Sequence, residues 1–324
     1  MAYTSGDLIL DDHYNIFAQG GATSPDHGTA NLNSIWGTGN GSTIGWGQSG
    51  NLATVSAGAT ITAAQWTNLL NRMNTIADHT NSTITSISNP SAGSTVSAYT
   101  ALSSNITTLW NNRGDCHASG TDITTGGVWT STATWTTAAY PRWDITWSSE
   151  AAMEYFFNAG GMIRVSGSRT GGSANNKNTE WTDLLTKMGT ICFTGGALTQ
   201  NIAGTNYTGT TKVGGGGTVD SISSNFGRHD ITSWDNTTWQ PLIFRQYADT
   251  APYTGNYVSH HVRGVSATTL RYGINAVDAA ADDGVLDNID GTLTFNLVVR
   301  PPSTTHISNS WGTPTITITG TSIS

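Results

Sequence analysis

Residues 150–191 read EAAMEYFFNAGGMIRVSGSRTGGSANNKNTEWTDLLTKMGTI, and they decide the fold of the C-terminal half. The stretch opens with a predicted helix, which Ser148 or Ser149 caps by accepting a hydrogen bond from a free backbone N–H. Apolar side chains recur there at spacings of three and four, which places them on one buried face: Met153, Phe156 and Phe157. Gly160 and Gly161 end the helix, because a left-handed terminal turn costs glycine least.

A strand and a second helix complete this stretch. Ile163 and Val165 alternate with polar residues, which predicts a strand with one dry face. Residues 166–177 read SGSRTGGSANNK and are expected to form a loop. Asn178 or Thr179 then caps a short helix with its own apolar stripe: Trp181, Leu184, Leu185 and Met188. We expect this unit to nucleate the core of the C-terminal half.

Alternating segments on both sides of this unit predict antiparallel strands. They include VWTSTATWTT and YPRWDITW within residues 116–147, then residues 231–247 and 257–277, and finally LTFNLVV and TPTITITG. Together these segments give at least seven strands, which is enough for two packed sheets. The sequence therefore predicts an α+β, mainly β chain, in which residues 116–324 form an antiparallel β-sandwich with two short helices.

A helical hairpin is predicted for residues 58–115. Thr62 and Gln65 form a capping box before a helix that reaches about Asp78, and a second helix ends near Gly114. Each helix carries one apolar stripe: Trp66, Leu69, Met73 and Ile76 in the first, and Tyr99, Leu102, Ile106 and Leu109 in the second. Two arrangements fit these stripes equally well. Either they continue across a subunit boundary in an oligomer, or they cover each other in a hairpin that lies on the β domain.

Residues 1–57 are predicted to be an extended docking segment. Their apolar residues form two short patches among glycine-rich turns, one at 8–10 and one from Tyr14 to Phe17. Patches of this size have no core of their own, so we expect them to be covered by a neighbouring protein or subunit.

Charge is scarce in this chain, since Asp, Glu, Lys and Arg make up 10% of 324 residues, against roughly a quarter in ordinary soluble proteins. Polarity comes instead from Thr, Ser, Asn and Gly, a profile typical of β-rich fibres and shells. A net charge of −8 without a basic run argues against nucleic acid as a partner. We expect no membrane span and no secretory signal. Cys116 and Cys192 are expected to be reduced and buried, with a disulfide between them as the alternative.

Motifs that carry enzymatic chemistry are few. Glu150 and Glu154 lie one turn apart, as a glycosidase pair could, but their place at a helix start already gives a structural reason. GWGQSG at 45–50 has the dinucleotide-binding spacing without the strand and helix that this fingerprint needs. His260 and His261 point to opposite faces of a strand and cannot chelate one metal. We therefore assign no catalytic, cofactor-binding or metal-binding residue.

Two further features allow a structural and a functional interpretation. Residues 278–290 are rich in aspartate, and a solvated acidic turn is favoured over a calcium site because the spacing is not that of an EF-hand: Asp278, Asp282, Asp283, Asp287 and Asp290. Four tryptophans form either a sugar-stacking platform or, as we favour, part of the sandwich core: Trp129, Trp135, Trp143 and Trp147.

EYFFNAGGMIRVSGSRTGG, followed by KNTEWTDLL, resembles a segment of large virion structural proteins of tailed bacteriophages. The likeness is to contractile-tailed phages of aquatic cyanobacteria and other marine bacteria in particular. DDHYNIF, IWGTGNGSTIGWGQ and ITAAQWTNLLNRMNTIADH are similar, in the same order, to segments of that family, as is the closing IDGTLTFNLVVRPPSTT. The resemblance touches about half of the chain. Its motifs are structural rather than catalytic.

This resemblance implies a non-enzymatic virion component that is assembled in the host bacterial cytoplasm. We expect it in the tail, as a fibre, fibre-attachment or baseplate-peripheral piece, with a neck or collar protein, or a capsid-surface fibre or decoration, as the alternatives. Its partners would be copies of itself and other virion proteins, without nucleic acid or membrane. A host-glycan receptor-binding module is the alternative function. A polysaccharide depolymerase is disfavoured because no well-placed acid pair is evident.

Overall fold

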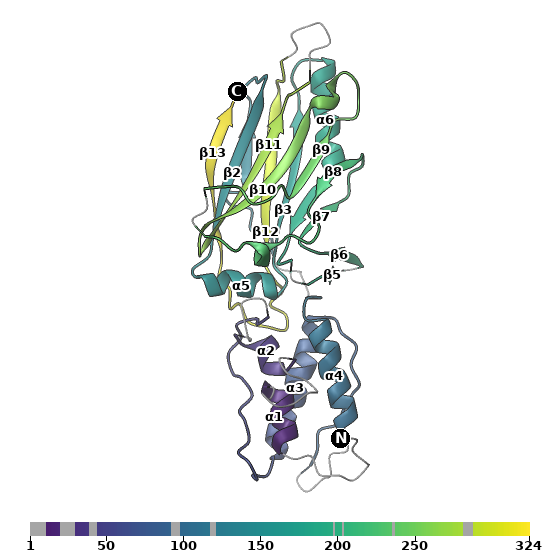
Figure 1. Ribbon diagram of the computed structural model, residues 1–324, viewed down its shortest axis with the longest axis vertical. Coiled ribbons are helices and arrows are strands. Elements are labelled where there is room, and N and C mark those ends of the chain that lie inside the picture. Colours follow the sequence, from purple (N-terminus) through teal and green to yellow (C-terminus); the bar gives the residue numbers. More distant parts are fainter. Residues whose placement is uncertain are drawn as a thin grey trace.

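The computed structural model describes residues 11–19, 30–38, 44–91, 98–116, 121–196, 198–202, 204–234, 237–280 and 288–324. Figure 1 shows an elongated molecule, with a helical part at one end and two packed sheets at the other. The predicted α+β, mainly β class is confirmed, and so is the antiparallel sandwich in the C-terminal part.

The sandwich consists of a five-stranded and a six-stranded sheet, and the strand pairs of the described residues are antiparallel. In spatial order, the five-stranded sheet contains β1 (Val128–Ser131), β12 (Thr292–Arg300), β3 (Met162–Thr170), β4 (Thr190–Phe193) and β7 (Thr210–Val213). The six-stranded sheet contains β13 (Thr315–Ile323), β2 (Ala138–Thr146), β11 (Thr269–Val277), β10 (Tyr257–Ser266), β9 (Phe244–Tyr247) and β8 (Val219–Ile222). A separate hairpin pairs β5 (Gln200–Ile202) with β6 (Thr205–Tyr207), and two short 3-10 turns are η1 (Arg228–Asp230) and η2 (Tyr253–Gly255).

Side chains from both sheets alternate between the core and the surface, most regularly along β2 and β12. The four tryptophans of the sequence analysis are at most 4% exposed: Trp129, Trp135, Trp143 and Trp147. Their interpretation as core residues is confirmed. A sugar-stacking platform built from these four side chains is therefore wrong.

Two helices close the sandwich core. α6 (Asn176–Met188) contacts β3 of one sheet and β9 and β10 of the other, and its whole apolar stripe is buried. α5 (Glu150–Asn158) lies at the end of the sandwich that faces the helical part (Figure 1). Its Phe156 and Phe157 pack on Trp147 with ring centroids 5.4 and 5.7 Å away. Both helices therefore contribute large side chains to the core between the sheets.

The deciding stretch folds largely as predicted, with two corrections. Ser149 caps α5 by accepting a hydrogen bond from Ala152 N, and Gly160 follows the helix with a φ of +106°. The predicted loop is too long, because β3 continues to Thr170 by pairing with β12. Gly167 permits this pairing, since a Cβ there would lie 2.8 Å from the ring of a β12 phenylalanine. The cap of α6 is Asn175, earlier than predicted.

Residues 231–247 differ more from their prediction. Of the described residues, only Phe244–Tyr247 form a strand, β9, and those just before it bond irregularly to β10, from Gln240 N to Val262 O and from Ile243 N to His260 O. Trp239 packs on the outer face of the six-stranded sheet, where a Cβ at Gly273 would lie 2.7 Å from its ring. Trp234 instead packs beside Gly264 near α5, where its Nε1 donates to Glu150. The alternating pattern was misread because Trp234 and Trp239 pack on other elements and lie outside β9, the regular strand of this segment.

In the helical part, the hairpin is confirmed. α3 (Ala63–His79) begins with the predicted capping box of Thr62 and Gln65, and α4 is Tyr99–Asn111. The stripe residues of both helices from Trp66 onward are at most 2% exposed apart from Tyr99, which is half-buried: Trp66, Leu69, Met73, Ile76, Leu102, Ile106 and Leu109. The stripes are thus covered within one chain, as the internal-hairpin interpretation predicts.

The prediction of an extended N-terminal segment is wrong for residues 11–19 and 32–36, whereas residues 44–57 contain neither helix nor strand. α1 (Asp11–Gln19) and α2 (Leu32–Trp36) are helices that contact each other and the hairpin. Tyr14 and Phe17 are at most 1% exposed, because spacings of three and four place them on one face of α1. The patch at residues 8–10 lies outside the described residues. No helix in the described ranges has the length and hydropathy needed to span a membrane.

Candidate contact surfaces and the domain junction

The GWGQ motif joins the helical part to the sandwich. The Gln48 amide pairs with the backbone of Ser308 in both directions, donating to its O and accepting from its N, each at 2.8 Å. Gly47 has a φ of +66°, and a Cβ there would lie 2.2 Å from the Tyr155 ring of α5. Gly47 therefore serves close packing between the two parts, which gives this glycine a structural reason without a nucleotide.

Further bonds tie the ends of both parts together. His79, at the end of α3, lies with Nε2 3.1 Å from Ala159 O, and its ring packs edge-on against Trp46 with centroids 4.7 Å apart. Asn158 of α5 donates to Gly45 O at 2.9 Å. We infer that the two parts form one stiff unit, because these bonds reach the same junction from several elements.

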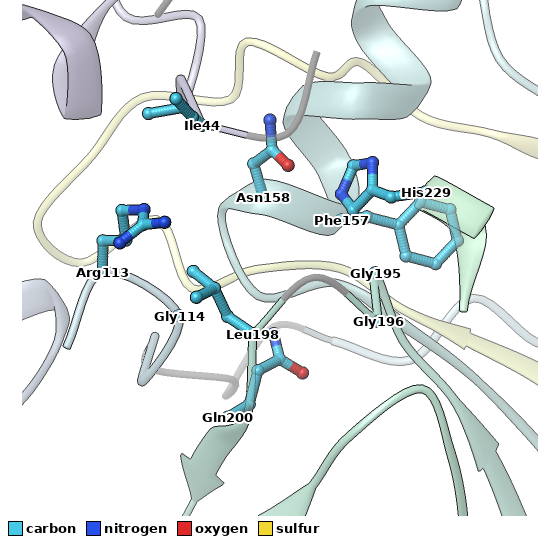
Figure 2. Close-up of a pocket in the computed structure, with 10 residues that line it drawn as sticks. All are labelled: Ile44, Arg113, Gly114, Phe157, Asn158, Gly195, Gly196, Leu198, Gln200 and His229. Carbon is cyan, nitrogen blue, oxygen red and sulfur yellow. The ribbon is translucent and has the colours of Figure 1, made fainter. Parts of the chain in front are cut away.

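A small cavity lies inside this junction, and Figure 2 shows the residues that line it. Its volume of about 20 Å³ is close to that of one water molecule and too small for a substrate. Gln200 Oε1 and His229 Nδ1 have no hydrogen-bond partner in the described chain. Burial, followed by the nearby Arg228 charge, lowers the pKa of His229 to about 3, so this imidazole is neutral at physiological pH.

The outer face of the six-stranded sheet gathers arginine and aromatic side chains, and we call it the arginine–aromatic face. Its centre is Trp239, with the guanidinium carbons of Arg142 and Arg263 at 5.0 and 4.9 Å from the ring. Its remaining members are Tyr140, Asp144, Asp220, Arg245, Tyr247, Tyr257, His261 and Arg271. Sequence reasoning missed this surface because it is assembled from five strands and a loop.

Two arginines on this face are charge-balanced and two are not. Arg271 forms a two-point ion pair with Asp144, at 2.6 and 2.7 Å. Arg142 and Arg263 donate instead to neutral acceptors, Asn275 Oδ1 and Thr237 O respectively. Burial, followed by the charges of Arg142 and Arg245, lowers the pKa of His261 to about 4.

His260 and His261 point to opposite faces, as predicted. His260 is fully buried, with Nδ1 2.8 Å from the Tyr272 hydroxyl and Nε2 3.2 Å from Met188 Sδ. His261 lies on the outer face, 3.0 Å from Ser259 Oγ. The two imidazoles therefore belong to separate environments.

The Glu150 and Glu154 carboxylates contact protein groups. Glu154 pairs with Arg228 at 3.3 Å, and burial raises the pKa of this carboxyl above its ordinary value. Glu150 accepts a hydrogen bond from Trp234 Nε1 at 3.2 Å. These bonds connect α5 to η1 and to the loop after it, which gives both residues a structural role.

The prediction of a solvated turn is wrong for Asp278, which is buried, whereas Asp290 is partly exposed on a loop. The Asp278 carboxylate pairs with the Lys177 ammonium at 3.0 Å. Their side chains are 2% and 3% exposed respectively. Asp290 accepts from Ser173 N and Oγ and from Asn178 Nδ2, which lowers the pKa of its carboxyl to about 2. Both carboxylates hold the start of α6. The other three aspartates of this segment lie outside the described residues.

Three carboxylates come together near the other end of α6. Oxygen atoms of Glu180, Asp183 and Asp249 lie within 4.8 Å of one another, as metal ligands would. The Lys187 ammonium lies 2.5 Å from Asp183 and 2.7 Å from Asp249. The Lys187 ammonium therefore provides the positive charge that a metal ion could otherwise provide to these carboxylates. Sequence reasoning missed the cluster because Asp249 is remote from the helix.

The two cysteines are free thiols and are buried, as predicted. Burial raises the pKa of Cys192 to about 11, which keeps this thiol protonated. Comparison of the chain with protein-family models, curated proteins and solved structures found no match.

Proposed function

We propose that this chain is a structural component of a tailed-phage virion, associated with the tail as a fibre, fibre-attachment or baseplate-peripheral piece. It acts by subunit assembly, with other virion proteins and copies of itself as partners. A position in the neck or collar, or on the capsid surface as a fibre or decoration, is the alternative. The sequence resemblance supports the class of particle, and the stiff junction between two parts suits a load-bearing piece.

The arginine–aromatic face is the observation that carries this proposal. Trp, Tyr and Arg are the side chains that contribute most to protein–protein binding, and here they cluster on one flat sheet. The chain as a whole is poor in charge, with Asp, Glu, Lys and Arg at 10%. Such a cluster fits a contact with a neighbouring subunit better than a purely solvated face.

The test is incorporation into particles of the phage that encodes the chain. Purified particles should contain the protein by mass spectrometry, and cryo-EM or immunogold labelling should place it on the tail. Arg263→Glu reverses a charge at the centre of the face, and we expect incorporation to fall at least tenfold. Thr130→Glu adds an acidic group to an exposed position of β1 on the other sheet and should leave incorporation unchanged.

Absence of the protein from purified wild-type particles would overturn the proposal. Equal incorporation of both variants would remove the arginine–aromatic face from it. Circular dichroism and thermal unfolding of the purified variants show whether a loss of incorporation reflects folding instead of contact.

A further inference from the structure

The helical part carries a groove on the outer side of α3. Its volume is about 460 Å³, within the usual range for small-molecule sites. One wall is the face of α3 that presents Gln65, Asn68 and Arg72, and the other is the extended chain of residues 50–53. Trp36 of α2 adds an aromatic surface. The groove belongs to neither the domain junction nor the arginine–aromatic face.

Arg72 is the charged group of this groove. Its guanidinium carbon lies 3.8 Å from the centre of the Trp36 ring, and Nη2 donates to Gly50 O at 2.8 Å. These two contacts fix the orientation of the guanidinium. Nη1 is buried and has no hydrogen-bond partner in the described chain. Because a guanidinium presents its N–H groups as a rigid fork, it matches the two oxygens of a carboxylate.

No carboxylate of the described residues balances this charge. Burial alone lowers the pKa of Arg72 to about 10, and the described groove lining contains no Asp or Glu. The guanidinium therefore stays protonated at neutral pH, in a groove whose lining carries one positive charge. A ligand with a single negative charge would complement it.

Amide and hydroxyl groups provide the remaining polar lining: Gln65, Asn68, Asn71 and Thr75. An amide has an acceptor and two donors, and a hydroxyl has both roles. Gln65 Oε1 already accepts from Thr62 and the Thr75 hydroxyl donates to Asn71 O, so the side-chain amides of Asn68 and Asn71 are the main groups for a ligand. Neighbouring hydroxyl groups of a sugar need this mixture, because each of them also donates and accepts. An apolar peptide anchor needs a hydrophobic socket instead, and this wall of α3 offers none among the described residues.

We propose that the groove binds a carboxylate-bearing sugar, with the carboxylate on Arg72 and the hydroxyl groups on the amides of α3. A uronic acid within a bacterial surface polysaccharide has this chemistry. The inference goes beyond the proposed virion role, because it concerns a ligand of the helical part wherever the chain is located.

The first experiment titrates the full-length protein with glucuronate and, separately, with glucose, using saturation-transfer difference NMR. Glucuronate should bind, and glucose should bind at least tenfold more weakly because it lacks the carboxylate. Arg72→Gln removes the charge and should abolish this preference for the acidic sugar.

A matched pair of variants separates binding from folding. Asn71→Asp places a carboxylate in the groove lining, whereas Asn74→Asp places one on an exposed position of the same helix outside that lining. Both change the net charge equally. Asn71→Asp should weaken glucuronate binding at least tenfold, and Asn74→Asp should leave it unchanged.

Three results would overturn this inference: no saturation transfer to glucuronate at millimolar concentration, equal weakening by the two aspartate variants, or tighter binding of a polyglutamate peptide than of glucuronate. The last result would assign the groove to an acidic protein partner. Particle incorporation reports on the proposed function separately, because Asn71→Asp should leave incorporation unchanged while it removes sugar binding.

Discussion

The helical part and the sandwich bury polar groups in different ways. In the helical part, neutral amides pair with both backbone groups of an extended residue, as Asn33 does with Leu52 and Asn105 with Thr85, at 2.8 to 2.9 Å. In the sandwich, the buried polar groups include charged pairs, of which Lys177 with Asp278 is the most enclosed. An amide that pairs on both sides leaves no charge to desolvate, whereas a buried ion pair depends on both partners.

This difference predicts which substitutions destabilise each part most. We call a side-chain amide that bonds to both backbone groups of one residue an amide clamp. It fixes the path of an extended segment, and its loss leaves two backbone groups unpaired. A buried ion pair fixes a helix between two sheets, and the loss of one partner leaves an uncompensated charge in the core. We therefore expect the sandwich to be the more sensitive part to single charge changes and to pH.

Asp278→Ala should have the largest effect on stability. It leaves the Lys177 ammonium buried at the start of α6, which costs about 3–5 kcal/mol for a buried pair of this kind. Urea unfolding followed by circular dichroism measures this loss. The double variant Lys177→Met with Asp278→Leu should recover most of it, because it removes both charges together.

Asp220→Ala is the matched control. Its pair with Arg245 lies on the surface, with side chains 37% and 34% exposed, so its loss should cost at most about 1 kcal/mol. If the two aspartate variants cost the same free energy, the buried pair does not distinguish the sandwich.

Acid should destabilise the sandwich next. Burial holds the pKa of His260 at about 3 and that of His229 at about 3, against 6.5 for an unperturbed histidine. Between these values the unfolded chain binds more protons than the folded chain, so stability is full above about pH 6.5 and falls as the pH decreases. Each histidine contributes a slope of about 1.4 kcal/mol per pH unit in that window.

The measurement is the free energy of unfolding at several pH values between 7 and 4.5 for the wild type and for His260→Gln. The variant keeps a polar group beside Tyr272 but cannot titrate, so its pH slope should be smaller by about one proton. Hydrogen exchange should show the first acid-induced opening in peptides of the sandwich. A pH slope that His260→Gln leaves unchanged would contradict this assignment.

A feature can be predicted from the sequence when the residues that form it are close together along the chain. The capping box of Thr62 and Gln65 is local, and α3 begins where it predicts. The extension of β3 depends on pairing with β12, far later in the chain, so its serine and glycine residues suggested a loop. Asp278 was misread for the same reason, because its partner Lys177 is remote in sequence. The candidate groove was equally hidden, since Trp36 and Arg72 meet only in the fold.

Asn105→Ala should have a smaller effect than the loss of the buried ion pair or acidification, and it tests the amide clamps directly. The change removes both bonds to Thr85 and leaves a buried N–H and C=O unpaired, which should cost about 2 kcal/mol. Asn112→Ala, which removes one bond to a side-chain hydroxyl near the end of α4, should cost less than about 1 kcal/mol. Because Asn105 carries no charge, its cost should be the same at pH 7 and pH 5, whereas the wild-type sandwich already weakens over that range. A pH-dependent cost for Asn105→Ala would mean that the helical part shares the charge sensitivity of the sandwich, and the distinction between the two cores would fail.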